Sequence, residues 1–219
     1  MSQIVEHIVL SKVKDNADPS LVNGMFDGLN ALKSLDQVLY LTAGKLLRVR
    51  SPSDNFTNVV HARYKSKDDL TAYSLHPDHV KLGKQYSEHI IDDFMALDWV
   101  AADFDGPVAP PPGSQVEIAF MKLRGGLGEE EKEEVLAAIG GIAKDCSGSG
   151  CGLASQINYG ENFSPRCKGF SVGLVAVYPD LKSLEEENVV KLVEERVGEK
   201  LEHVIVFDYI VPPPYPPYI

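Results

Sequence analysis

The sequence has no long apolar run and no excess of positive charge, and each absence removes a class of protein. No stretch approaches the roughly 20 apolar residues that a membrane-spanning helix needs, so we expect no transmembrane segment. The net charge is -11, whereas proteins that bind nucleic acid or an anionic membrane surface need a basic footprint. We therefore expect neither nucleic acid nor membrane among the partners of this protein.

Cysteine is also scarce, and the usual cofactor motifs are missing. The three cysteines, Cys146, Cys151 and Cys167, lack a Cys-x-x-Cys pair, so they predict thiols rather than a disulfide framework or a zinc site. There is no glycine-rich phosphate-binding motif and no nucleophile elbow, so no organic cofactor is expected. Because Glu6 and His7 interrupt the first apolar run, it does not read as a secretory leader, and we expect a cytoplasmic protein.

What the sequence does contain is an internal repeat. Hydrophobic residues make up 44% of the chain, which is enough for a sizeable core. Three pairs of segments match in order and spacing: Gln3–Lys12 with Gln115–Arg124, Asn55–Leu70 with Gly169–Leu184, and Ala96–Val100 with Val206–Ile210. Each half is therefore predicted to be one copy of a unit of about 100 residues.

Within each half, the hydrophobic pattern predicts the order strand, helix, strand, strand, helix, strand. Val5–Lys12 alternates with period two, as a half-buried strand does, and Asp18 and Pro19 have the residue types that begin a helix. Further strands are predicted at Val38–Lys45, Thr57–Tyr64 and Ala96–Val100, and helices at Lys67–Leu75, His79–Met95, Glu129–Lys144 and Glu185–Lys200.

This order predicts an α+β fold of two tandem ferredoxin-like (βαββαβ) units. An antiparallel sheet with both helices on one face leaves its other face bare, and in a tandem chain the two bare faces can cover each other. We expect an intramolecular pseudo-dimeric α/β barrel with a cavity between the sheets, and hence a monomer. The predicted parts are a first domain at 1–104, a Pro-rich linker at 105–114, a second, degenerate domain at 115–211 and a Pro-rich tail at 212–219.

One segment of the first half carries residues suited to proton transfer. Tyr73 precedes His76, Pro77 and His79, and Pro77 disfavours helix at His76 while it can begin the next helix. If His7 on the first strand points the same way, these side chains could share a cavity toward the mouth of the barrel. An imidazole can take a proton from a carbon beside a carbonyl, and a phenol can hydrogen-bond the enolate oxygen that forms.

The alternative is an architectural turn in which each imidazole caps a helix end or bonds a backbone carbonyl. The second half lacks the motif, because the stretch from Phe170 to Asp208 is four residues shorter than the one from Phe56 to Asp98. If there is a site, we expect one per chain.

These residues resemble the plant stress-response A/B barrel (dimeric α/β barrel, Dabb) domain family. The resemblance rests on the strand with His7, on Phe56-Thr57, on the Tyr73…His76-Pro77-x-x-His79 turn and on the closing Leu97-Asp98-Trp99. It covers the first half directly and the second half through the repeat, as in tandem members of the family. It implies a stress- or plant-defence-response protein, and most members have no defined reaction.

One branch of that family, olivetolic acid cyclase, is a cofactor-independent polyketide cyclase. The resemblance implies Tyr73 and His79 as the catalytic pair, with His7 and His76 in support. Asn58 stands where that branch has a further pocket histidine.

The resemblance also implies a divalent cation such as Mg²⁺ near the end of the first helix. Its ligands would be backbone carbonyls at Leu32, Leu35, Asp36 and Val38. Hard cations do accept carbonyl oxygens.

Three hypotheses follow for the function. The first is a stress-response protein whose cavity holds a small apolar or phenolic ligand, with a polar end at Tyr73 and His79. The second is a polyketide cyclase or isomerase in which His79 is the general base. The third is a protein that acts through its surface and stability alone.

Overall fold

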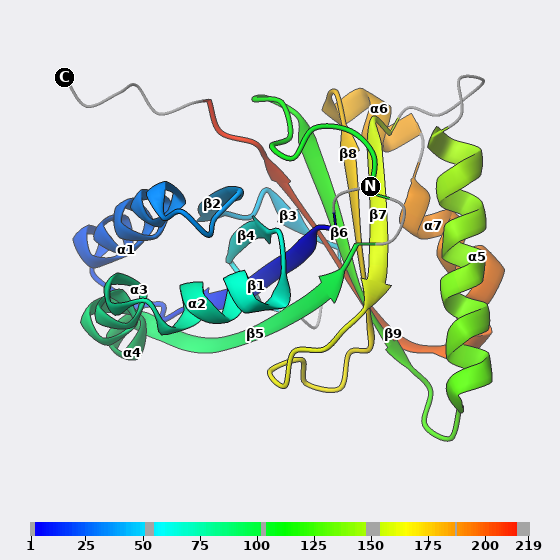
Figure 1. The fold of residues 1–219 in the computed structure, drawn as a ribbon, viewed down its shortest axis with the longest axis horizontal. Helices are drawn as coiled ribbons and strands as arrows, with labels where there is room; N and C mark the ends of the chain where they lie inside the picture. The colour runs from blue at the N-terminus through cyan, green and yellow to red at the C-terminus, as the bar shows by residue number, and fades with distance from the viewer. Residues whose placement is uncertain (1–2, 51–54, 102–103, 148–153, 187, 214–219) are drawn as a thin grey trace.

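The computed structural model describes residues 3–50, 55–101, 104–147, 154–186 and 188–213. Cys151 and residues 214–219 of the predicted tail lie outside this part of the chain. Two antiparallel sheets form the centre of the molecule, with strand orders β2-β4-β1-β5 and β3-β9-β6-β8-β7. Helices α1 to α4 cover the outer face of the first sheet, and α5 to α7 cover that of the second (Figure 1).

The first unit contains β1 (Val5–Val13), α1 (Pro19–Ala31), η1 (Leu32–Ser34), β2 (Tyr40–Lys45), β3 (Arg48–Val49), β4 (Asn58–Tyr64), α2 (Lys67–Leu75), α3 (Pro77–Leu82), η2 (Gly83–Ser87), α4 (Glu88–Ile90) and β5 (Ile91–Val100). The second contains β6 (Gln115–Leu123), α5 (Glu129–Ser147), β7 (Gln156–Glu161), β8 (Val172–Tyr178), α6 (Leu181–Glu186), α7 (Val189–Val197), η3 (Gly198–Lys200) and β9 (Leu201–Ile210). The predicted α+β architecture of two ferredoxin-like units is confirmed.

In the described residues, no helix combines the length and the apolar character needed to cross a membrane.

Local signals placed several element ends correctly. Asp18 caps α1 by accepting a hydrogen bond from the Ser20 backbone N–H (2.8 Å), and Pro19 is the first helical residue, as predicted. The prediction was wrong for the closing strands, which begin at Ile91 and Leu201 rather than at Ala96 and Val206. Each must match the full length of the central strand beside it, so pairing overrides the helical pattern there.

The repeat holds, but the predicted match of the first strands is shifted by two residues. Val5 pairs with Tyr64, and Gln115 pairs with Tyr178, so Val5 corresponds to Gln115 and His7 corresponds to Glu117. A shift of two leaves every side chain on the same face of a strand, so the alternating pattern alone could not detect it.

The space between the sheets is filled with side chains. A buried cluster joins residues of both sheets: Ile8, Leu10, Met95, Leu97, Val116, Ile118, Phe120 and Phe207, among others. Trp99 is fully buried there and packs on Gly160 and Gly173, two glycines that face each other in β7 and β8. The expectation of a cavity between the sheets is therefore wrong, because this interior is a packed core.

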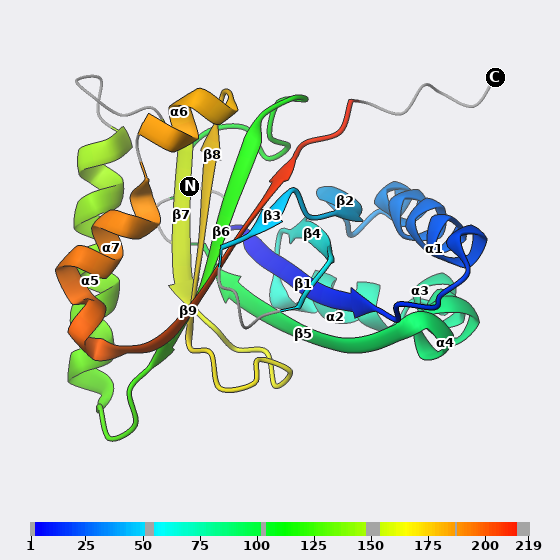
Figure 2. The ribbon, with the colours of Figure 1, turned by 180° about the vertical axis from the view of Figure 1, so that it is seen from behind.

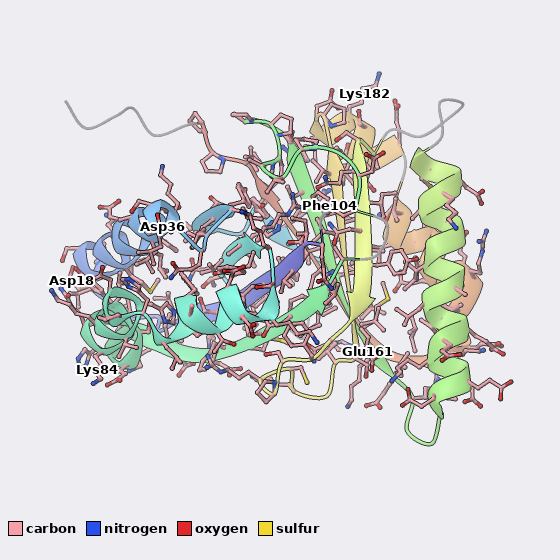
Figure 3. The ribbon with its side chains drawn as sticks, viewed as in Figure 1. Asp18, Asp36, Lys84, Phe104, Glu161 and Lys182 are labelled. Atoms are coloured by element: carbon pink, nitrogen blue, oxygen red, sulfur yellow. The ribbon has the colours of Figure 1, made fainter. Side chains whose placement is uncertain are left out.

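Four polar side chains also form a hydrogen-bonded network in this interior. Glu6 accepts hydrogen bonds from Arg63 Nε, Asn158 Nδ2 and His61 Nε2, each at 2.8 Å, and all four side chains are buried. Burial opposes the charged carboxylate, but the charge of Arg63 and the contact with His61 outweigh it and lower the pKa of Glu6. Phe104, labelled in Figure 3, lies where the units meet, with its ring centre 5.1 Å from Arg63 Cζ.

In each unit, a short segment leaves its own sheet and pairs with the edge strand of the other unit, an arrangement that we call the strand exchange. The prediction missed β3, which leaves the first unit and pairs with β9 (Figure 2). The Leu47 and Arg50 backbone N–H groups donate to the carbonyls of Asp208 and Val206, both at 2.8 Å. Residues 162–166 of the second unit run along β5 in the same way, where Phe163 N–H donates to the Asp98 carbonyl (2.8 Å).

Candidate functional site

A cavity of about 420 Å³ lies in the first unit, between its sheet and its helices. Its volume falls in the range of small-molecule sites. The floor is formed by β1, β4 and β5, and the roof by α1, α2, α3, η2 and α4. Apolar side chains line most of it: Val9, Met25, Phe26, Leu29, Val59, Val60, Ile91 and Phe94. The polar members are His7, Ser11, Asn58, Tyr73, Ser74, His79, Ser87, Glu88, Asp92 and Arg166.

His7 enters this cavity from the middle of β1, on the opposite face from Glu6. It lies directly across from Asp98 on β5, and its Nδ1–H donates to Asp98 Oδ1 at 2.5 Å. An ionised carboxylate can only accept a hydrogen bond, so this contact assigns a proton to Nδ1. The Nε2 atom is the ring nitrogen that remains available to a ligand. Only 12% of each side chain is exposed.

Pro77 separates two short helices and sends the two histidines of the turn in different directions. The His76 side chain caps α3 by accepting a hydrogen bond from the Asp78 backbone N–H (3.3 Å), and it is not part of the cavity wall. His79 lies one turn later and lines the cavity, with its ring centre 4.6 Å from that of Tyr73. The structure therefore brings together Tyr73, His79 and His7, whereas His76 has the architectural position.

The surroundings of His79 favour a neutral imidazole. Its Nδ1–H donates to the Ser74 carbonyl (3.1 Å), so Nε2 carries the lone pair. Burial lowers the pKa of His79, and the nearby positive charge of Arg166 acts in the same direction, while the hydrogen bond to the Ser74 carbonyl opposes them. Tyr73 is almost fully buried, and burial raises the pKa of its phenol well above the ordinary value. A neutral base thus stands beside a protonated phenol.

The stretch predicted to hold a cation forms a tight turn after α1. The Leu32 carbonyl accepts from Leu35 N–H (3.1 Å), and the Leu35 carbonyl accepts from Val38 N–H (2.9 Å). Each carbonyl keeps a second lone pair, but the only carboxylate of the set is that of Asp36, which is exposed and lies at the opposite end of α1 from Asp18 (Figure 3). This donor set is too incomplete to support a mechanism, and the Mg²⁺ site stays a prediction. In the described part of the chain, His, Cys, Asp and Glu side chains form no group of three that could hold a metal.

The second unit has charged residues at the positions that correspond to this site. Glu117 stands in place of His7, and Asp208 in place of Asp98, on the helix-covered face of the second sheet. Arg50 reaches both, with Nη1 2.7 Å from Glu117 Oε1 and Nη2 3.2 Å from Asp208 Oδ1, and Arg48 also pairs with Asp208. The corresponding space is therefore occupied by an ion cluster.

Sequence reasoning missed two residues of the site. Asp98 was visible through its match to Asp208, but only the register of β1 and β5 shows that it faces His7. No sequence pattern indicated Arg166 as a site residue. It belongs to the second half of the chain and reaches the cavity only through the strand exchange.

Known proteins resemble this chain over most of its length. A family model described as "Stress responsive A/B Barrel Domain" (Dabb) matches residues 5–101. Two stress-response A/B barrel domain-containing proteins of Arabidopsis thaliana are similar to it. One is 41% identical over 96% of this chain and 80% of its own length. The other, DABB1, is 40% identical over 97% of this chain and 99% of its own length.

Among solved structures, an anthrone oxidase-like protein superposes on the whole chain. Its TM-score is 0.62 at 11% identity, and the match covers 100% of this chain and 98% of the other. At that identity the likeness shows a shared fold and nothing about activity. The relatives at about 40% identity carry the assignment, and the chain belongs to the stress-response A/B barrel (Dabb) domain family.

Proposed function

We propose that this stress-response A/B barrel protein binds a small, largely apolar or phenolic molecule in the cavity of its first unit. The observation that supports it is the cavity itself, whose lining combines a group of apolar side chains with polar ones that include Tyr73, His79 and His7. A few convergent polar groups in an apolar pocket are the usual composition of a ligand site. The location differs from our expectation, since the ligand would lie under the helices.

The test is a thermal-shift screen with phenolic, polyketide and fatty-acyl compounds. A ligand that binds only the native state raises the melting temperature through mass action. We expect a shift that His79→Ala removes and that His89→Ala keeps, because His89 is exposed and outside the cavity wall. If no compound shifts the wild-type protein, or if His79→Ala responds like the wild type, the proposal is wrong.

A second candidate function is favoured by the orientation of His79. With Nδ1–H held by Ser74, Nε2 could take a proton from a carbon between two carbonyls of a β-keto compound. The Tyr73 hydroxyl would donate a hydrogen bond to the enolate oxygen, and the enolate carbon would attack a second carbonyl of the same molecule. The proton taken up by His79 would then pass to the new alkoxide. This is an aldol-type ring closure that needs no cofactor.

The first step of that reaction can be measured by itself. Proton abstraction exchanges the acidic C–H for deuterium in heavy water, which NMR follows on a β-diketone too short to cyclise. We expect His79→Ala to abolish the catalysed exchange and Tyr73→Phe to slow it by about 10²-fold or more. Exchange that is no faster with the wild-type protein than in buffer would exclude this candidate and leave the binding proposal standing.

We also propose that the chain works as a monomer. The inner faces of the two sheets already cover each other, so the usual reason for a ferredoxin-like unit to dimerise is removed. Light scattering at micromolar concentration should give the mass of one chain, 24.0 kDa. A mass twice as large would contradict this.

A further inference from the structure

The strand exchange places one arginine from each unit at an equivalent point beside the other unit. Arg50 lies beside Val206, two residues before Asp208, and its N–H donates to the Val206 carbonyl (2.8 Å). Arg166 lies beside Ala96, two residues before Asp98, and its carbonyl accepts from Ala96 N–H (3.1 Å). The two arginines therefore occupy corresponding places at the edges of β9 and β5.

Their side chains have different surroundings. Arg50 turns inward because two buried carboxylates, Glu117 and Asp208, attract it. At the first unit, His7 replaces the glutamate, and the single carboxylate there, Asp98, is already engaged by His7 Nδ1–H. Arg166 stays exposed in the cavity wall, and its guanidinium makes no ion pair with the carboxylates of the described residues.

The other charges at the cavity do not neutralise Arg166. Of the two acidic residues in the wall, Asp92 is paired with Lys12 (3.1 Å), and Glu88 is exposed on α4. Arg166 is the one Lys or Arg side chain among the described lining residues.

A guanidinium beside an apolar cavity is suited to an anionic group on an otherwise apolar ligand. Its planar fork matches a carboxylate with two parallel hydrogen bonds, which an ester cannot reproduce. Ala96 is paired with Val9, two residues along β1 from His7, so Arg166 and His7 are offset by roughly 7 Å along the strands. That offset fits an aromatic acid of the size of a hydroxycinnamate.

We propose that the second unit supplies Arg166 as the carboxylate-binding residue of the first unit's cavity, and that the preferred ligand is an aromatic or short-chain organic acid. The acid group lies at Arg166, and the apolar body extends under the helices toward Tyr73 and His79. This inference rests on the proposed ligand-binding function and adds the chemical class of the ligand.

The test compares 4-hydroxycinnamic acid with its methyl ester by isothermal titration calorimetry at pH 8 and low ionic strength. The wild-type protein should bind the acid at least tenfold more tightly than the ester, and salt should reduce the preference. Arg166→Ala should remove the preference while ester binding stays unchanged. Arg166→Lys should keep part of it, because a lysine retains the charge without the fork.

Arg196→Ala is the matched control, since Arg196 is an exposed arginine on α7 outside the cavity wall, and it should keep the full preference. Equal binding of acid and ester by the wild-type protein would overturn the role of Arg166 and leave the binding function intact. An acid preference that survives in Arg166→Ala would do the same. Absence of binding by both compounds would overturn this inference, and the proposed function would then rest on the thermal-shift screen alone.

Discussion

The two units share one backbone plan, yet one has an open cavity where the other has an ion cluster. In the first, His7 faces Asp98 and Arg166 stays at the mouth of the cavity. In the second, Glu117 and Asp208 hold Arg50. This difference coincides with one strand position, where the first unit has His7 and the second has the acidic Glu117, which forms an ion pair with Arg50.

The core between the sheets shows a second asymmetry of the same kind. Trp99 of β5 packs on Gly160 and Gly173, whereas its counterpart Tyr209 donates a hydrogen bond to His61 Nδ1 (2.7 Å). Val59 occupies the position in the first sheet that corresponds to Gly173. A large residue in one unit is matched by a small one in the other, which makes the two units complementary rather than interchangeable.

The largest effect should come from removing Arg50, the partner of two buried carboxylates. Arg50→Ala leaves Glu117 and Asp208 buried with only Arg48 beside them, and we expect a loss of about 3 kcal/mol in unfolding free energy. Arg166→Ala, at the equivalent place, should change stability by less than about 0.5 kcal/mol. Urea unfolding at pH 8 measures both, and equal losses would contradict the asymmetry.

The second prediction concerns the pH dependence of the ion cluster. Burial raises the pKa of Glu117 from its ordinary 4.5 to about 7, because the pull of Arg50 does not fully offset desolvation. Between these values the folded protein holds a proton that the unfolded chain lacks, so the Glu117 contribution favours folding at low pH and is lost as pH rises toward 7.

Glu117→Gln removes this titration. The stability difference between the wild type and Glu117→Gln should be more favourable to the wild type at pH 5 than at pH 8, by on the order of 3 kcal/mol. Urea unfolding at the two pH values measures it. The buried His61 titrates in both proteins, so its effect cancels in this difference. If the unfolding free energies of the two proteins change with pH in parallel, Glu117 is ionised in the folded protein at both pH values, and the prediction is wrong.

The third prediction tests the packing asymmetry. In Gly173→Ala the added Cβ meets the Trp99 ring, so we expect a loss of about 2 kcal/mol from forced repacking. Gly44→Ala, in β2 of the first sheet, is the control, because a Cβ there meets nothing within 4 Å. Thermal unfolding of both variants measures the contrast, and an equal effect would mean that the Trp99 contact is not a constraint.

The smallest effect should separate the two histidines of the turn. His76→Ala removes the cap of α3 and should cost at most about 1 kcal/mol, with ligand binding preserved. His79→Ala should abolish binding and change stability little, because its side chain is only half-buried. Calorimetric titration of both variants measures this difference in ligand binding. If His76→Ala also loses binding, both histidines of the turn contribute to the ligand site.

Much of this fold was predictable from local signals. The N-cap at Asp18, the amphipathic pattern of Glu129–Lys144 and the alternation of Val5–Lys12 each report a local physical preference, and each marks an element in the structure. The grouping of Tyr73, His79 and His7 also followed from strand phase and the turn at Pro77. The strand ends at Ile91 and Leu201 did not follow, because strand pairing decides them.

The sequence by itself determined the two ferredoxin-like units and the polar trio, since these depend on periodicity and on neighbours along the chain. Only the tertiary structure decided that the space between the sheets is a packed core, that the cavity lies under the helices, and that Arg166 belongs to it. The physical reason is that each unit completes the sheet edge of the other. Residues more than 60 positions apart, such as Ala96 and Arg166, become neighbours through backbone pairing that leaves no local pattern.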